Sequence, residues 1–453
     1  METVSVTTRE SQLEEIRGVI ETKNVELLHM QFVDIEGTLK HVTITAEQLD
    51  QAANGEVMFD GSSITGFTPI NHSDLYLSPD LTTFAVLPWT EEEGYSEARF
   101  LCSVKKPGGS DFQGDPRNVL KETVKRAEDK GYSINVGPEL EFFLFETDAD
   151  GQPTLKTQDV GGYFEPSPKD NGEKVRLAIY KALKKMGFTI EASHHEVAIG
   201  QHEINFKYAD VLGAADAATT YKWVVKTVAG QHGLHATFMP KPLAGANGSG
   251  MHTNISLFHL EEQKNAFYDE RDELGLSEIA YQFIAGLLDN VKDFVAVTNP
   301  LVNSYKRLVP GYEAPCYIAW SASNRSALIR IPATRGAGTR VEIRCPDPSA
   351  NPYFAFAVVA SAGLDGVERE LIAPLAVNDD IFSMTRQECF ERGIQNLPSN
   401  LESALDFFES GKLGRNTLGE HAFKEYIELK RGEWDDFRTT VSDWEVSAYQ
   451  AKF

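Results

Sequence analysis

The sequence is poor in basic residues relative to acidic ones. Its 453 residues include 43 Lys and Arg against 67 Asp and Glu, which gives a formal net charge of −24. Nucleic acids and anionic membranes bind through basic patches, so this charge argues against both as partners. One reading is an ordinary acidic protein. We favour adaptation to high salt, as in a halophile, because screening by salt lowers the self-repulsion of such a surface.

Long apolar runs and clustered cysteines are also missing. No stretch reaches the roughly 18 to 20 apolar residues that cross a bilayer, and the richest run, Tyr353 to Leu364, is too short. The acidic, polar start of the chain shows no signal-peptide pattern. We therefore expect a cytoplasmic protein with reduced thiols. The four cysteines lie far apart, without zinc or redox spacing: Cys102, Cys316, Cys345 and Cys389.

The length of the chain exceeds one ordinary core, so we expect two or more domains. The segment 106–111, Lys-Pro-Gly-Gly-Ser-Asp, has the composition of a linker. Asp115 and Pro116 after it predict the N-cap and first turn of a helix that reaches Lys130. The part before the linker is predicted to be β-rich, with a helix at 11–22, a hairpin formed by 25–34 and 39–44, and short strands at 75–80 and 84–89.

After residue 111, strand-like and helix-like segments alternate. Two glutamates stand in the first of these strands, at 134–145. Side chains alternate along a strand, so Glu139 and Glu141 point to the same side and repel each other. Alone, this pattern fits an exposed acidic face equally well, because glutamate is usually at the surface. The predicted helices cover 172–186, 209–228 and 277–297.

Three later stretches carry polar side chains on strand-like segments near glycine. Gly200 predicts a turn that would bring two glutamates of 191–206 to the same place. The Gly-rich loop 247–250 runs into a strand with three polar side chains on one face, and charged residues alternate in 340–344. Each stretch alone is more often a surface or structural feature. The residues concerned are Glu196, Glu203, His252, Asn254, Ser256, Arg340, Glu342 and Arg344.

Together these stretches supply five glutamates and one histidine. Such an oxygen-rich set without thiolate suits Mg²⁺ or Mn²⁺, and more than four carboxylates imply more than one ion. Multi-metal sites beside arginines are typical of phosphoryl transfer. No Gly-x-x-x-x-Gly-Lys-Ser/Thr motif is present, so ATP would be held by metals and arginines instead. The arginines available in this half are Arg307, Arg325, Arg330, Arg335, Arg340 and Arg344.

Six motifs in this order make the chain resemble type I glutamine synthetases of bacteria and archaea. They span nearly the whole length: 59–63 (Phe-Asp-Gly-Ser-Ser), 137–143, 247–252, 303–315, 324–326 and 342–353. The resemblance implies an α+β fold, with an N-terminal β-grasp domain over 1–106 and a catalytic α/β barrel-like domain with a helical tail over 107–453. It also implies the reaction: ATP and glutamate give γ-glutamyl phosphate, which ammonia attacks to give glutamine.

The resemblance further assigns roles to residues. It implies two or three Mg²⁺ or Mn²⁺ ions, one held by Glu141, Glu196 and Glu203 and another by Glu139, His252 and Glu342. Catalytic roles fall to Asp60, which takes a proton from ammonium, Glu313 on a mobile flap, and the phosphate-facing Arg344 and Arg325. Glutamate and ammonium would contact Asn247, Gly248, Arg307, Glu313, Arg325, Arg344, Ser63, Tyr163 and Glu203. The nucleotide, ATP, would contact Asn254, Ser256, Arg330 and Arg340.

The same resemblance implies partners and regulation. Subunits would form two stacked six-membered rings, a dodecamer, with the tail from Trp444 to Phe453 docking between rings and Asp60 serving the neighbour's site. A small nitrogen-regulatory protein is a further candidate partner. Two positions depart from regulated subgroups: Phe382 replaces a modifiable tyrosine, and Pro69 replaces a feedback-sensing arginine.

Two alternatives stay open from the sequence. A ligase of the same superfamily that joins glutamate to a polyamine or another amine would keep the metal and ATP residues but lose the ammonium site; Asp60, Ser63 and Glu313 argue against it. A non-catalytic regulatory relative would have gaps among the metal ligands, and the sequence shows none.

Overall fold

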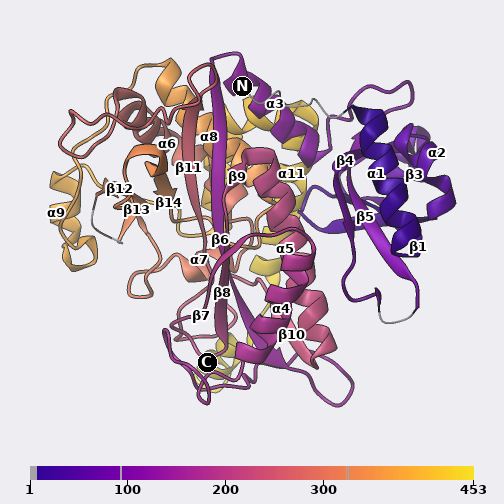
Figure 1. Ribbon diagram of the computed structural model, residues 1–453. Coiled ribbons are helices and arrows are strands. Elements are labelled where there is room, and N and C mark those ends of the chain that lie inside the picture. Colours follow the sequence, from indigo (N-terminus) through magenta and orange to yellow (C-terminus); the bar gives the residue numbers. More distant parts are fainter. Residues whose placement is uncertain (1–7, 92–93, 323, 325) are drawn as a thin grey trace.

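The chain forms two β-sheets with helices packed around them, so the expected α+β class is confirmed. The computed structural model describes residues 8–91, 94–322, 324 and 326–453. In Figure 1 the smaller sheet lies at the right, apart from the larger sheet that fills the centre of the molecule.

The small sheet has five strands in the order β2-β1-β5-β4-β3. β1 pairs with β5 in parallel, and the other neighbours are antiparallel. The predicted hairpin is confirmed: β1 and β2 are joined by a turn in which Gly37 has a φ of +85°, a conformation that favours glycine. The elements are α1 Arg9–Thr22, β1 Val25–Val33, β2 Leu39–Thr45, α2 Leu49–Ala53, β3 Val57–Asp60, β4 Asp74–Val86 and β5 Ser96–Lys105.

One local prediction for this part of the chain needs correction. The pieces expected at 75–80 and 84–89 form one strand, β4, whose register shifts between Asp80 and Ala85. The Asp80 carboxylate accepts hydrogen bonds from the backbone and hydroxyl of Thr82, which stabilises an irregularity inside the strand. The segment 106–111, which has the composition of a linker, connects β5 to α3 and contains a turn closed by a hydrogen bond from Lys106 N–H to the Ser110 carbonyl.

The large sheet has ten strands. Its main path is β15-β12-β13-β14-β11-β6-β8-β7, and β9 and β10 also pair with β6. β6 therefore lies at the centre, with β11 on one side and β8 on the other. The strands are β6 Tyr132–Glu146, β7 Ile190–His195, β8 Gln201–Phe206, β9 Ala209–Asp210, β10 Leu234–Thr237, β11 Met251–His259, β12 Tyr317–Ser321, β13 Ala327–Arg330, β14 Val341–Ile343 and β15 Gln395–Asn396.

Helices pack on this sheet and on one another to form the main core. The predicted N-cap of α3 is confirmed, since the Asp115 carboxylate accepts a hydrogen bond from Arg117 N–H at 3.0 Å. The helices are α3 Pro116–Glu128, α4 Glu173–Lys185, α5 Val211–Gln231, α6 Glu278–Thr298, α7 Ser304–Arg307, α8 Pro352–Glu368, α9 Arg386–Glu391, α10 Leu401–Ser410, α11 Leu413–Thr439 and α12 Asp443–Tyr449.

One asparagine joins the small sheet to the main core. Asn351 is the N-cap of α8, and its side-chain oxygen accepts a hydrogen bond from Tyr353 N–H. Its amide group donates to the carbonyls of Asp34 and Ile35 in the β1–β2 turn, at 3.1 and 3.3 Å. The same turn places Gly37 directly against the Asn351 backbone, where a Cβ would come within 2.8 Å.

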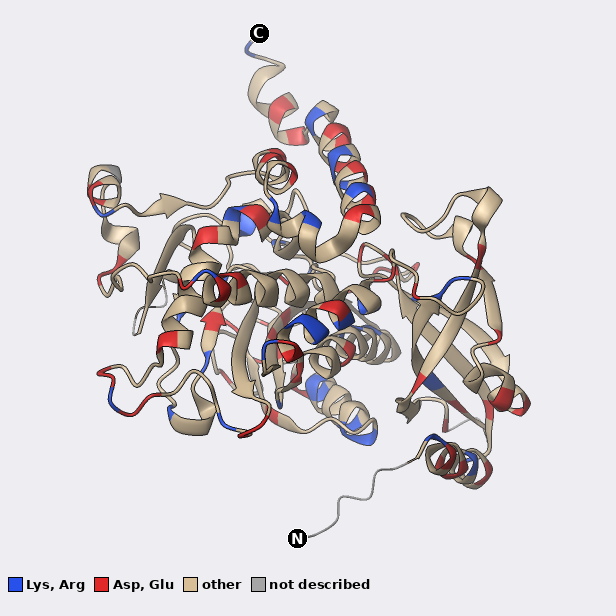
Figure 2. Cartoon of the chain, turned by 90° about the horizontal axis from the view of Figure 1, so that it is seen from above, with Lys and Arg blue, Asp and Glu red and all other residues tan. Residues whose placement is uncertain are grey.

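The C-terminal end projects from the body. In Figure 2, the end of the long charged helix α11 and the short α12 extend beyond the rest of the chain. Trp444, Tyr449 and Phe453 are exposed on this tail. Among the described residues, no helix combines the length and the apolar composition needed to cross a bilayer. The four cysteines are buried and unpaired.

The crossing of α6 and α8 provides a test of the packing. A Cβ on Gly286 would lie 2.3 Å from the Ala362 carbonyl oxygen and 2.7 Å from the Gly366 Cα. We expect Gly286→Ala to destabilise the protein by about 1 to 3 kcal/mol, because the helices cannot separate without losing core contacts. The midpoint of thermal or urea unfolding measures this change.

Gly230→Ala in α5 is the matched control, since a Cβ there meets nothing within 4 Å. It should be neutral or stabilise by up to about 1 kcal/mol, because alanine restricts the unfolded chain more than glycine does. Equal unfolding midpoints for the two variants would contradict the close packing described for α6 and α8.

Candidate active site

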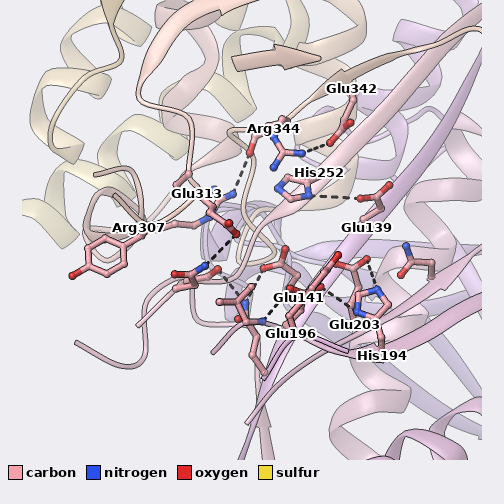
Figure 3. A pocket seen from close by; sticks show the side chains of 18 of the residues that line it. Glu139, Glu141, His194, Glu196, Glu203, His252, Arg307, Glu313, Glu342 and Arg344 are labelled. Carbon is pink, nitrogen blue, oxygen red and sulfur yellow. Dashed lines mark hydrogen bonds and ion pairs between the residues drawn. The ribbon is translucent and has the colours of Figure 1, made fainter. Parts of the chain in front are cut away.

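The register of β6 with its two neighbours brings the first polar side chains together. His252 of β11 lies opposite Glu139, and Glu203 of β8 lies opposite Glu141. Because Glu139 and Glu141 are on the same face of β6, the four side chains gather on that face (Figure 3). Strand pairing thus holds two carboxylates near each other although they repel.

The next strand pairs extend the site on both sides. Beyond β11, β14 places Glu342 opposite Asn254, and β13 places Arg330 opposite Glu342. Beyond β8, β7 places His194 opposite Glu203. Gly200, with a φ of +69°, makes the predicted turn between the two halves of 191–206. Glu196 follows β7 directly and points into the same space (Figure 3).

One group of possible metal ligands comprises Glu139, His252 and Glu342. Their ligand atoms lie within 4.8 Å of one another, and His252 Nδ1 is 3.6 Å from Glu139 Oε2. Glu342 also binds two arginines: its carboxylate accepts from Arg330 Nε and from Arg344, each at 2.5 Å. The structure thus brings together the three residues that the resemblance assigned to one ion.

A second group comprises His194, Glu196 and Glu203. The two His194 nitrogens lie 3.2 Å from Glu196 Oε1 and 3.7 Å from Glu203 Oε1. Glu141, which was expected with these two glutamates, lines the same cavity. Its Oε2 accepts hydrogen bonds from Gln201 Nε2 and Gly250 N–H, both at 2.9 Å, which leaves Oε1 for the cavity.

Burial and mutual repulsion alter the acidity of these groups. Burial raises the pKa of Glu141 to about 7, against the opposing effect of Arg307. Burial and the charge of Glu141 raise the pKa of Glu196 to about 8, and the same kind of environment raises the pKa of Glu203. Burial and Arg344 lower the pKa of His252, which leaves its imidazole neutral. Several carboxylates short of positive charge beside neutral imidazoles form a donor set that fits divalent cations.

Two cavities meet at this site. The first, of about 330 Å³, is lined by both groups of possible ligands and by Tyr163, Asn247, Gly248, Arg307, Glu313, Arg330 and Arg344. The second, of about 270 Å³, is lined by Asn254, Ser256 and Arg340. Glu139 and Asn205 line both cavities. Arg330, which was expected near the nucleotide, therefore lies in the first cavity with Glu342.

Loop residues and the end of α7 line part of the first cavity. Glu313 has a φ of +58°, which is unusual for a residue with a side chain, and Asn247 Nδ2 donates to its carboxylate at 3.3 Å. Arg307 is buried and donates to the carbonyls of Arg344, Cys345 and Pro346.

Two described residues of the predicted site, Asp60 and Ser63, are not part of these cavities. Asp60 and Ser63 lie at the edge of the small sheet, where the Asp60 carboxylate accepts hydrogen bonds from Ser62 and Ser63. These hydrogen bonds lower the pKa of Asp60. Arg325 lies outside the described residues.

Sequence reasoning missed three residues that contact the site: His194, Gln201 and Asn205. His194 could have been found, because it is two residues before Glu196 on a strand and shares its face. Gln201 and Asn205 lie two residues on either side of Glu203 and so share its face of β8, but they carry no charge that would have marked them as ligands. Their roles depend on how β8 pairs with β6 and β7, which the sequence does not state.

Comparison with known families gives two matches that together span most of the chain. Residues 24–107 match the model described as "Glutamine synthetase, beta-Grasp domain", and residues 113–449 match "Glutamine synthetase, catalytic domain". The expected β-grasp unit followed by a catalytic unit is therefore confirmed.

Curated relatives carry the same family name, and a solved structure has the same fold. A glutamine synthetase of Clostridium saccharobutylicum is 56% identical over 440 residues, covering 97% of this chain and 99% of that protein. One of Staphylococcus aureus is 54% identical over 441 residues, covering 97% and 98%. The solved structure titled "GmaS/ADP complex-Conformation 1" superposes with a TM-score of 0.87 at 30% identity, covering 96% of this chain and 99% of that one.

The raised pKa values predict proton release when metal binds. Glu141 and Glu196, with pKa values of about 7 and 8, are largely protonated at pH ~6.5, and a divalent ion must displace those protons. The affinity for Mn²⁺ should therefore rise with pH between ~6 and ~8.5, by up to about tenfold per unit for each proton displaced.

Calorimetry at pH ~6.5 in buffers of different ionisation enthalpy measures the number of protons released. Glu196→Gln should release fewer protons than the unmodified protein. Metal binding without proton release in the unmodified protein would show that the carboxylates are already ionised.

Proposed function

The chain belongs to the glutamine synthetase family, and from this premise we propose which of its residues carry out the ATP-dependent ligation of ammonia to glutamate. The observation that carries the proposal is the convergence of the five candidate ligand glutamates, His252 and three arginines on a cavity beside a second cavity. Metal-rich cavities with arginines suit phosphoryl transfer, and the second cavity gives the nucleotide its own place.

We propose that the metal ligands are Glu139, His252 and Glu342 in one group and Glu141, Glu196 and Glu203 in the other, with His194 close to the second group. Two or three Mg²⁺ or Mn²⁺ ions bound there would neutralise charge on the phosphoryl group as it leaves ATP. Neutral imidazoles and crowded carboxylates support this assignment.

The nucleotide is proposed to occupy the second cavity, against Asn254, Ser256 and Arg340. Support comes from the position of this cavity and from the similar structure, whose title names ADP. Glu139 lines both cavities, so the phosphates of ATP would reach the first cavity beside it. There Arg344 and Arg330, both bound to Glu342, would face the transferring phosphoryl group and stabilise its charge. The same role for Arg325 rests on the resemblance alone.

Glutamate is proposed to bind in the first cavity near its loops. Arg307 would hold the α-carboxylate, because a guanidinium forms paired hydrogen bonds with a carboxylate. Its hydrogen bonds to three carbonyls fix its position and leave N–H groups for the substrate. Asn247 and Gly248 would contact the rest of the amino acid. Glu313 would close over the acyl phosphate and exclude water, which otherwise hydrolyses it.

The ammonium site is proposed to be completed by a second copy of this chain. Tyr163 and Glu203 line the first cavity, whereas Asp60 and Ser63 lie outside it, at the exposed edge of the small sheet. We propose that Asp60 of one subunit enters the cavity of the next and takes a proton from ammonium, because only neutral ammonia can attack the acyl phosphate. Ring assembly through such a head-to-tail contact fits the proposed dodecamer.

The domain boundary, the assembly, the salt requirement, the location and the regulation of the protein are part of the same proposal. We place the domain boundary between residues 106 and 107, and the exposed tail at Trp444 between rings. The net charge of −24 supports a requirement for salt, which sedimentation and activity in low and molar KCl would test. A cytoplasmic location, a small regulatory protein partner, and a lack of modification at Phe382 remain predictions, as does the lack of feedback sensing at Pro69.

The reaction itself is tested by phosphate release and glutamine formation. With ATP, glutamate, Mg²⁺ or Mn²⁺ and ammonium, the protein should form glutamine, and excess chelator should abolish this activity. Arg344→Ala should lower kcat by roughly 10²- to 10³-fold, because it removes charge stabilisation in the transition state. Lys181→Ala on the exposed face of α4 is the control. Faster turnover with putrescine than with ammonium would favour an amine ligase instead.

Mixed assemblies test the shared site. Asp60→Ala and Arg344→Ala subunits should each be nearly inactive, but assembled together they should recover part of the activity. The reason is that some sites then combine an intact Asp60 from one chain with an intact Arg344 from another. Mixed assemblies, verified by a tag on one variant, that stay as inactive as either parent would show that both residues serve one site from the same chain.

A further inference from the structure

A cluster of five buried charged and ionisable side chains lies behind the first cavity and takes no part in lining it. We call it the hairpin brace. It connects three parts of the chain: the loop between β6 and α4, the helix α4, and the β7–β8 hairpin. Its members are Asp159, Asp170, Arg176, His195 and His202.

The brace combines hydrogen bonds with longer contacts between ionisable groups. Asp159 Oδ2 lies 3.3 Å from His195 Nε2 and 3.7 Å from His202 Nε2. Arg176 donates to His202 Nδ1 at 2.8 Å and to Asp170 Oδ2 at 2.7 Å. Asp170 Oδ1 accepts from Gly172 N–H at 2.9 Å.

The donor set of the brace does not suit a metal ion, although two carboxylates and two histidines stand close together. Arg176 always carries its protons, so the His202 Nδ1 that it contacts is an acceptor and the ring proton is on Nε2. His202 therefore has no lone pair to offer, and both Asp170 oxygens already accept hydrogen bonds. Space is short as well, since a Cβ at Gly172 would lie 2.4 Å from the His202 ring.

The contacts that leave the brace lead to the cavity. His195 Nδ1 donates to the carbonyl of Glu196 at 2.6 Å. Asp159 Oδ1 accepts from Gly200 N–H at 2.8 Å, in the turn of the hairpin. Phe164 N–H donates to the His195 carbonyl at 3.1 Å, which fixes the loop next to Tyr163.

From this arrangement we propose that Asp159 and His195 are positioning residues, which set the places of Glu196, Glu203 and Tyr163 in the cavity. Such positioning is needed because the carboxylates repel one another, which acts to spread the β7–β8 hairpin away from β6. A buried ionic network behind the hairpin opposes that movement. The loop that carries Tyr163 is bound to the same network. The network therefore fixes the proposed metal ligands Glu196 and Glu203 and the proposed ammonium contact Tyr163 relative to one another. The inference rests on the proposed roles of Glu196, Glu203 and Tyr163.

The first test is Asp159→Asn, which keeps the size of the side chain but removes its charge. In the full-length protein, Mn²⁺ affinity measured by calorimetry without substrates should fall by about tenfold or more. The KM for ammonium should rise several-fold, with a smaller change in kcat. A merely structural role would lower the unfolding temperature without these two changes.

Asp216→Asn is the matched control. Asp216 is also a buried carboxylate in a charged network, although its partners are Arg117 at 2.7 Å and the Tyr353 hydroxyl at 2.7 Å, and it lines neither cavity. It should lower the unfolding temperature while leaving Mn²⁺ affinity within about twofold. Equal effects of both variants on stability, with unchanged Mn²⁺ affinity and unchanged KM for ammonium, would overturn the proposal.

A second pair of variants, at His195, tests the positioning role even if Asp159→Asn does not fold. His195→Ala should weaken Mn²⁺ binding, and His195→Asn should restore part of it, because an asparagine amide can donate where His195 Nδ1 does. Absence of any difference between the two would overturn the proposal. So would metal analysis that finds an ion in the unmodified protein beyond those of the cavity and loses it in His195→Ala.

Failure of the proposed function is distinguishable from failure of this inference. Mn²⁺ binding is measured without any reaction, so it reports on the positions of Glu196 and Glu203 whichever amine is the substrate. A protein that binds Mn²⁺ as described but forms no glutamine would refute the proposed reaction and leave the brace supported.

Discussion

The repulsion among carboxylates gathered in one buried cavity is the constraint on which the rest of the structure depends. Such groups stay together only if the backbone holds them and positive charge compensates them. The central strand β6 meets the first requirement, because its ladders with β8 and β11 fix Glu139 and Glu141 beside Glu203 and His252. Arg330 and Arg344 supply part of the compensating positive charge, through their ion pairs with Glu342. The remaining deficit of positive charge suits divalent cations and a phosphoryl group.

Much of this site could be read from local patterns. Alternation along a strand placed Glu139 with Glu141, and Gly200 predicted the turn that returns Glu203 towards Glu196. What could not be read was the register between strands distant in sequence, which brings His252 opposite Glu139. The same limit explains Arg330, whose place beside Glu342 follows from the pairing of β13 with β14.

The fold was predictable to a similar degree and for similar reasons. The hairpin of β1 and β2, the N-cap Asp115 and the long helices follow from residue preferences and periodicity. The single strand β4 was predicted as two strands. Local propensity does not show that β4 pairs with β5 on both sides of the register shift between Asp80 and Ala85. Glycine and proline marked the connection at 106–111, but not the hydrogen bond from Lys106 N–H to the Ser110 carbonyl that closes its turn.

The single amide of Asn351 has a consequence for the timing of folding during synthesis. It caps α8 and also binds the β1–β2 turn, in a contact with Asp34 that spans 317 positions of the chain. At synthesis rates of roughly 5 to 20 residues per second, the turn would wait about 15 to 60 s for its partner. Once Lys105 has been made, the small sheet is complete in sequence, but its β1–β2 turn still lacks the Asn351 amide and α8. The newly made chain therefore has a period of exposure that the finished protein does not have.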